Sequence, residues 1–346
     1  MRNELILANL GWQPFFQQQL SLQEWEELVP ARIVEQHRSE IEVATASGHV
    51  ILPVLQSMPA LTVGDWILLD GEGSFLRALE RKSCFRRKAA GTGAKEQLLA
   101  ANVDTAFIVC SLNDDFNLNR IERYLSVVNN AEAEAVIVLS KADLCSDPEA
   151  FRAEVQRLDS MLCVEVVSNL VDGAADVLRP WCQPGKTVVL LGSSGAGKST
   201  LANRLLGRDL QSTGAIREDD AKGRHTTTRR SLVEMPAGAM ILDTPGMREL
   251  QLADCEQGVA ATFADIEELA RECRFGDCVH DTEPGCAVRS AIESGQLEER
   301  RYLNYCKLSR EQVLNSASLA ERRAADKKRG RYYKTVQRES RGSRRE

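Results

Sequence analysis

A glycine-rich segment in the second half of the chain has the residue types that bind phosphate. It matches the pattern GxxxxGK[ST] and follows the apolar run Val188–Leu191. In such a loop, backbone N–H groups wrap a β-phosphate, the lysine (here Lys198) reaches the β- and γ-phosphates, and the next hydroxyl (Ser199) coordinates Mg²⁺. The nine candidate nucleotide-binding residues of this loop are Gly192, Ser193, Ser194, Gly195, Ala196, Gly197, Lys198, Ser199 and Thr200.

A second element for the metal and the γ-phosphate follows the apolar run AMIL. Asp243 comes 44 residues after Ser199 and begins a DxxG pattern that ends at Gly246. We expect Asp243 to hold Mg²⁺ through water and the Gly246 N–H to contact the γ-phosphate. The segment between the two elements contains GRHTTTRR, and one of Thr226–Thr228 could close onto Mg²⁺ as in a nucleotide switch. An ordinary solvated loop is the alternative.

A third polar cluster has the residues that read a purine base. The run AVIVLS ends in Ser140, and Lys141, Ala142 and Asp143 follow, one residue away from the NKxD element of GTPases. In that element the aspartate accepts hydrogen bonds from guanine N1–H and its exocyclic amine, an edge that adenine lacks, and the lysine stem packs over the base. The pair Ser168 and Asn169 resembles the next element, whose backbone contacts guanine O6.

Three thiols and an imidazole lie within 14 residues of the C-terminal third. Their spacing is Cys-x4-Cys-x-His-x5-Cys. This set satisfies a tetrahedral structural Zn²⁺ site, which would stabilise a loop-rich region too small to form its own core. The candidate zinc ligands are Cys273, Cys278, His280 and Cys286.

The segments around these clusters predict a multidomain protein. Between Pro30 and Lys82, five short apolar-alternating runs separated by glycine turns predict a small β-barrel of the OB type. From Asn102 onward, strands alternate with helices and predict a parallel α/β sheet with helices on both faces. A long helical stretch is expected from about Val288 to Ala325. The expected units are residues 1–27 (leader, with a short helix around Trp12–Leu20), 28–93 (OB-like barrel), 94–254 (α/β P-loop GTPase domain), 255–320 (zinc-binding, mainly helical domain) and 321–346 (basic tail).

The motif order differs from that of ordinary small GTPases, in which the phosphate loop comes first. Here the base-reading motif at 140–143 precedes the phosphate loop at 192–200. The sequence therefore predicts a circularly permuted GTPase domain.

Charge is distributed unevenly along the chain. The 346 residues contain 44 Lys or Arg and 50 Asp or Glu, a net charge of −6. Residues 321–346 hold 11 basic and four acidic residues, a net of +7, so the other 320 residues carry −13. A basic tail on an acidic body is either a solubilising terminus or a nucleic-acid contact. No apolar run reaches the length of a membrane span, and ten Cys in a chain of this size indicate reduced thiols, so we expect a cytoplasmic protein.

Taken together, these motifs resemble the ribosome small subunit-dependent GTPase A family. The resemblance covers nearly the whole chain and rests on ARIVEQHR, VGDW, AANVD, DFNLNRIERYL at 115–125, SKADL, GSSGAGKST, GRHTTTRR, LDTPGMRE and the Cys/His spacing. It implies slow GTP hydrolysis, stimulated by the small ribosomal subunit and acting in late maturation of that subunit. The implied ligands are GTP or GDP with Mg²⁺ and one structural Zn²⁺. The implied partners are rRNA and further assembly factors, and the resemblance implies a monomer.

Two residues of this chain differ from those usual in GTPase motifs, and both differences bear on activity. Ser140 replaces the usual Asn, which removes an amide that supports the base pocket. Met247 stands where signalling GTPases place a water-orienting Gln, as is usual in this family, and implies slow intrinsic turnover. His225 is the catalytic candidate that the resemblance suggests for positioning the water. A solvated loop histidine is the alternative.

Two other function classes stay open at this point. One is a nucleotide-gated rRNA-binding module with little turnover, which Met247 and Ser140 motivate. The other is an ATPase or kinase that uses the same phosphate loop, which the SKAD element argues against. Residues 86–93 are expected to form a basic, glycine-containing linker that leaves the barrel. Basic residues around this barrel exit (Arg81, Lys82, Arg86, Arg87 and Lys88) offer charge for RNA.

Overall fold

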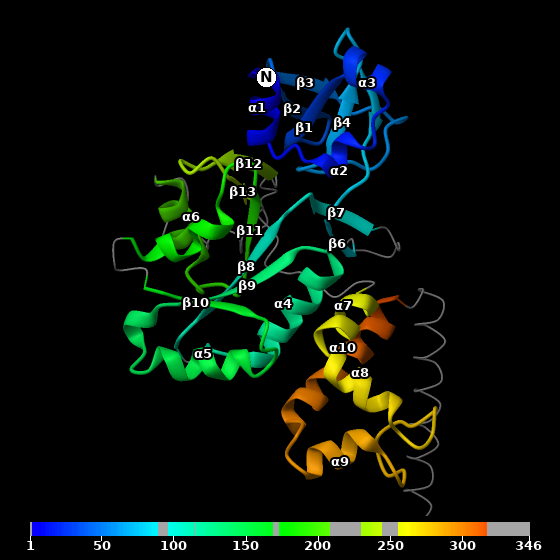
Figure 1. Cartoon of the computed structure of the whole chain (residues 1–346), viewed down its shortest axis with the longest axis vertical. Coiled ribbons are helices and arrows are strands. Elements are labelled where there is room, and N and C mark those ends of the chain that lie inside the picture. Colours follow the sequence, from blue (N-terminus) through cyan, green and yellow to red (C-terminus); the bar gives the residue numbers. More distant parts are fainter. Residues whose placement is uncertain are drawn as a thin grey trace, which may run out of the picture.

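One mixed sheet of 11 strands connects the N-terminal barrel with the nucleotide-binding half of the protein (Figure 1). The computed structural model describes residues 2–88, 96–113, 115–168, 173–207, 230–243 and 255–316. The strand order is β10-β9-β8-β11-β13-β12-β1-β2-β3, with β4 pairing to β1 and β5 to β4. Among the described helices, none combines the length and apolar character that a membrane span requires.

The five strands expected for the barrel are present and antiparallel. Their pairing order is β3-β2-β1-β4-β5, and no pairing joins β3 to β5 within these described strands, so the barrel is open there. Its strands are β1 (Val29–Gln36), β2 (Glu40–Thr45), β3 (Gly48–Pro53), β4 (Trp66–Leu69) and β5 (Phe75–Ala78).

The N-terminal segment, expected as a leader with one short helix, covers the outer face of the barrel. It forms three short helices, α1 (Arg2–Asn9), α2 (Pro14–Gln17) and α3 (Leu22–Glu27). Trp66 and Leu68 of β4 pack with Leu7 and Phe16 of these helices, whereas Ile67 and Leu69 face the main core. Because alternate residues of β4 are covered from both sides, the strand is apolar throughout.

A two-stranded hairpin follows the barrel where the sequence predicted a basic linker. β6 (Cys84–Lys88) pairs antiparallel with β7 (Glu96–Ala101). Arg86 and Arg87 therefore lie in a strand, while residues 89–93 of the expected linker fall outside the described residues.

The α/β half has the predicted parallel arrangement with helices on both faces. Along β8, Ala106 and Ile108 face the core shared with α4, whereas Phe107 and Val109 face the core shared with α6. This alternation explains why the strand is apolar at all five positions between Thr105 and Ser111. The elements are β8 (Thr105–Ser111), α4 (Leu118–Asn130), β9 (Glu134–Ser140), η1 (Ala142–Leu144), α5 (Pro148–Gln156), β10 (Cys163–Val167), η2 (Ala174–Trp181), β11 (Thr187–Leu191), α6 (Lys198–Leu206), β12 (Arg230–Glu234) and β13 (Met240–Asp243).

The C-terminal part is helical and lies against α4 (Figure 1). Its helices are α7 (Glu256–Thr262), α8 (Ala264–Arg271), α9 (Ala287–Glu293) and α10 (Glu299–Ser316). The single long helix expected from Val288 is therefore two helices, because Gly295 adopts a positive φ of 76° and ends the first. Residues beyond 316, including the basic tail, lie outside the described residues.

Candidate nucleotide and metal sites

The phosphate loop lies between β11 and α6, as the sequence predicted. Gly192, Gly195 and Gly197 have φ values of 143°, 78° and 92°. At Gly192 an added Cβ would lie 2.2 Å from the Val109 carbonyl oxygen, so the loop passes β8 at a distance that excludes any side chain. Ser199 and Thr200 stand in the first turn of α6, where backbone N–H groups are free to bind an anion.

The lysine of the loop contacts the loop itself. Lys198 Nζ donates a hydrogen bond to the Gly192 carbonyl at 2.8 Å and another to the Ser193 carbonyl. The ammonium is thus held over the segment that would surround the phosphates.

The base-reading residues meet at the carboxyl ends of β9 and β10. These strands are parallel, with Ser140 opposite Val167. Asp143 lies in the short turn η1, and Ser168 Oγ donates to Asp143 Oδ1 at 2.8 Å. Lys141 precedes the turn with a left-handed φ of 57°. Asn169 lies outside the described residues.

Ser140 joins the base-reading segment to the phosphate loop. Its side chain is buried, and Oγ donates to the Ala196 carbonyl at 2.6 Å. Ala196 belongs to the phosphate loop. The hydroxyl therefore links the two halves of the pocket, a role that sequence reasoning considered lost with the missing amide.

An ion pair beside the loop was not identified from its residue types. Asp115 Oδ2 accepts from Ser193 Oγ at 2.7 Å and is paired with Arg120 of α4. The hydrogen bonds from Arg120 and Ser193 lower the pKa of the Asp115 carboxyl. In the sequence, the pair is marked only by its place in the run DFNLNRIERYL at 115–125, one of the motifs that carry the family resemblance.

The third phosphate element is described only in part. β13 runs parallel to β11, with Leu242 opposite Val189, so Asp243 ends the strand that neighbours the phosphate-loop strand. Gly246, Thr226–Thr228 and the catalytic candidate His225 lie outside the described residues.

The four predicted zinc ligands converge. Their candidate ligand atoms lie within 4.8 Å of one another. Cys273 Sγ lies 3.5 Å from His280 Nδ1 and 3.9 Å from Cys286 Sγ, and His280 Nδ1 lies 3.4 Å from Cys286 Sγ. A tetrahedron with Zn–S of about 2.3 Å and Zn–N of about 2.0 Å has edges of about 3.5 to 3.8 Å. The donor set and the distances among Cys273, His280 and Cys286 therefore fit Zn²⁺.

Two of the basic residues at the barrel exit serve internal contacts. Arg81 holds the buried Asp65 carboxylate through hydrogen bonds of 2.6 and 2.8 Å, and the hydrogen bond to Asp65 raises the pKa of Arg81. Lys82 contacts Asp104 at 3.3 Å and Gln13 at 3.1 Å. These two side chains are thus less available to RNA than the sequence indicated.

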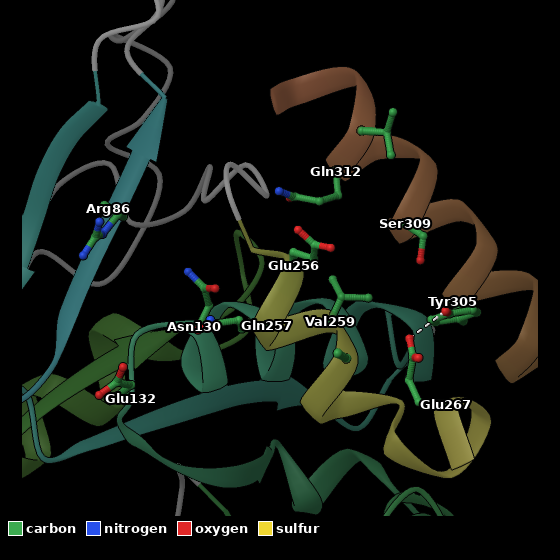
Figure 2. A pocket seen from close by; sticks show the side chains of 12 residues that line it. Arg86, Asn130, Glu132, Glu256, Gln257, Val259, Glu267, Tyr305, Ser309 and Gln312 are labelled. Carbon is green, nitrogen blue, oxygen red and sulfur yellow. Dashed lines mark hydrogen bonds between the residues drawn. The ribbon is translucent and has the colours of Figure 1, made fainter. Parts of the chain in front are cut away.

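A cavity of about 730 Å³ lies between the β6 strand, the end of α4 and the helices α7, α8 and α10. Figure 2 shows the side chains that line it. Its walls include Glu132, Glu256 and Glu267, against one arginine, Arg86. Glu267 accepts from the Tyr305 hydroxyl at 2.7 Å. A lining with this charge balance disfavours a phosphate backbone.

Comparisons with known proteins identify GTPases as relatives of this chain, in agreement with the phosphate loop and the base-reading residues described above. The family model described as "RsgA GTPase" matches residues 78–253. The chain is 57% identical to "Small ribosomal subunit biogenesis GTPase RsgA 2" of Vibrio parahaemolyticus, over 95% of this chain and 92% of the relative. It is 45% identical to "Small ribosomal subunit biogenesis GTPase RsgA" of Mesorhizobium japonicum, over 94% and 95%.

Solved structures show the same fold. The crystal structure of YjeQ from Thermotoga maritima aligns with a TM-score of 0.63 and 25% identity, over 83% of this chain and 99% of that one. YloQ, described as a circularly permuted GTPase, aligns with a TM-score of 0.59 and 22% identity, over 84% and 96%. The predicted fold class is confirmed. The chain belongs to the RsgA GTPase family and is a GTP hydrolase.

Proposed function

We propose that GTP and GDP bind across residues 192–200 and 140–143, with the phosphates on the loop and guanine on Asp143 and Lys141. The observation that carries this proposal is the Ser140–Ala196 hydrogen bond, which joins the two segments in one pocket. Because Ser168 donates to only one oxygen of Asp143, the carboxylate keeps acceptor capacity for the guanine N1–H and amine edge.

The metal roles follow from the residue types. Ser199 would hold Mg²⁺ together with one of Thr226–Thr228 and, through water, Asp243. When bound, Mg²⁺ neutralises charge on the transferred phosphoryl group. The Gly246 N–H would contact the γ-phosphate. His225 is our candidate for positioning the attacking water, and with Met247 after the DxxG pattern we expect slow intrinsic turnover.

We infer that this hydrolysis serves the biogenesis of the small ribosomal subunit, because the curated relatives are named for that process. The proposed partners are the subunit and its rRNA, gripped by the barrel, the zinc-binding region and the basic tail. GTP would order the 208–230 segment and dock the complex, and hydrolysis would release it. We further propose a cytoplasmic monomer that acts beside other assembly factors.

The test is GTP turnover with and without purified small subunits. We expect a low rate that rises when subunits are added, and Lys198→Ala should abolish it in both conditions. Co-sedimentation with GTP or GDP measures binding in parallel. Nucleotide-dependent binding without stimulated turnover would overturn the proposal in favour of a nucleotide-gated rRNA-binding module.

A further inference from the structure

The Asp115–Arg120 pair lies at the start of α4, directly beside the phosphate loop. Arg120 Nη1 lies 2.7 Å from Asp115 Oδ2, and Arg120 Nη2 lies 2.9 Å from Oδ1. This two-point geometry fixes both side chains, because a planar guanidinium and a carboxylate match in shape. Asn117 caps α4 by accepting from the Arg120 backbone N–H, which also fixes the base of the arginine.

The pair holds one particular residue of the loop. Asp115 Oδ2 accepts from Ser193 Oγ at 2.7 Å, and Lys198 Nζ donates to the carbonyl of the same serine. A bound nucleotide would compete with that carbonyl for the three N–H donors of Lys198, because the β- and γ-phosphates also accept hydrogen bonds. Asp115 holds Ser193 through its side chain, independently of this competition.

A carboxylate at this position also creates an electrostatic problem. Phosphates bound to the loop repel Asp115, because like charges a few ångströms apart destabilise each other. An aspartate is ionised at neutral pH, and the hydrogen bonds from Arg120 and Ser193 lower the pKa of Asp115 further. Arg120 cancels this charge through its two hydrogen bonds.

We propose that Asp115 and Arg120 form a charge-balanced pair that positions Ser193, and with it the phosphate loop, for GTP and GDP. Asp115 supplies the acceptor for the loop, and Arg120 removes the repulsion that this acceptor would otherwise exert on the phosphates. Both are positioning residues. The inference rests on the proposed placement of the nucleotide on residues 192–200.

Arg120→Gln is the decisive variant, because it leaves the Asp115 charge without its partner. We expect GDP and GTP to bind about tenfold more weakly, as for one unbalanced like charge near the site. The loss should shrink as salt is added, because salt screens partly exposed charges. The KM for GTP should rise with kcat nearly unchanged, since neither side chain is placed at the attacking water.

The double variant Asp115→Asn/Arg120→Gln separates charge balance from simple scaffolding. The amide oxygen of Asn can still accept from Ser193, and no unbalanced charge remains, so affinity should return to within about threefold of the unmodified protein. Arg120→Lys keeps the charge and should lose less affinity than Arg120→Gln. A pair that only stabilises the fold predicts that the double variant is at least as impaired as Arg120→Gln.

Arg152→Gln is the matched control. Arg152 is as exposed as Arg120 (33% against 31%) and also pairs with carboxylates, but those belong to α5 and β10. The Arg152→Gln variant should bind GDP and GTP as tightly as the unmodified protein. Equal affinities of Arg120→Gln and Arg152→Gln, or no recovery in the double variant, would overturn the inference. Failure of the unmodified protein to bind GDP or GTP would instead refute the proposed nucleotide site.

Discussion

Ser140 illustrates how a short side chain can hold two motifs together. A buried hydroxyl that donates to a backbone carbonyl contributes about 1 kcal/mol, and its loss also leaves the acceptor unpaired. Here the acceptor is the Ala196 carbonyl, in the middle of the phosphate loop. This one hydrogen bond therefore stabilises the position of the phosphate loop relative to the base-reading segment.

Ser140→Ala should accordingly weaken GDP binding about five- to tenfold, since about 1 to 1.4 kcal/mol of positioning is lost. Ser126→Ala is the control, because Ser126 is equally buried but its hydroxyl bonds only to the Glu122 carbonyl within α4. Fluorescent GDP titration measures both. If the two variants bind GDP alike, Ser140 has no special role in the pocket.

Asp143→Asn tests the base assignment. The amide can no longer accept from both N1–H and the exocyclic amine of guanine, so the preference for GTP over ATP should fall by about tenfold or more. Competition of GTP and ATP for the same site provides the measurement. Asp176→Asn, an exposed aspartate in η2 paired with Arg179, should keep the original preference. An unchanged preference in Asp143→Asn would refute the guanine pocket.

At the scale of elements, α4 connects the phosphate loop with the C-terminal helices. Its first turn carries Arg120, and two residues later Glu122 is fully buried and contacts Arg300, Arg301 and Asn304 of α10. Arg301 also pairs with Asp265 of α8. A buried carboxylate with this many donors fixes how the helices dock, because any other docking would leave its charge unpaired.

Glu122→Gln should therefore loosen the docking of α10 by about 3 kcal/mol, since removing one charge of a buried cluster strands its cationic partners. Glu311→Gln should cost no more than about 1 kcal/mol, because the Arg123–Glu311 pair is partly exposed and solvent screens it. Hydrogen exchange of the α10 amides measures both. Equal protection in the two variants would show that burial of Glu122 does not control the docking.

The zinc ligands define a second element-scale test. Cys278→Ser should lower the bound zinc from one per chain to a substoichiometric amount and speed amide exchange in residues 272–287, because the loop depends on the metal. Cys163→Ser, at an exposed cysteine outside the cluster, should keep one zinc. GDP affinity should be unchanged in both. Full zinc in Cys278→Ser would refute the ligand set.

Local patterns predicted most elements but not their long-range pairings. β8, β9, β10 and β11 were readable because each is an apolar run bounded by turn residues. The hairpin strand β6 was missed because Arg86–Lys88 gives it no apolar alternation. The role of Asp115 was missed because its contact with Ser193 joins residues 78 positions apart, and no periodicity reports such a contact.

At the scale of the whole molecule, the barrel and the nucleotide domain are joined by strand pairing. β1 pairs antiparallel with β12, with Gln36 opposite Arg230 and Glu35 opposite Ser231. The buried Arg32 adds a second link, since its guanidinium donates to the Leu10 and Asn102 carbonyls. Because β12 directly follows the 208–229 segment, the barrel is attached at the exit of the predicted switch.

The charge distribution gives the last prediction. A body of net −13 is repelled by rRNA, whereas residues 321–346 carry 11 basic side chains and a net of +7. Each tail cation that neutralises a phosphate steepens the dependence of log K on log salt by about 0.7 to 0.9.

Deleting 321–346 should therefore weaken subunit binding and flatten this slope, by about 4 if five cations make contact. A tail with the same residues in shuffled order should restore both, because phosphate contacts depend on charge and not on order. Sedimentation across a salt series measures the slope, and an unchanged slope after deletion would show that the tail only solubilises the chain.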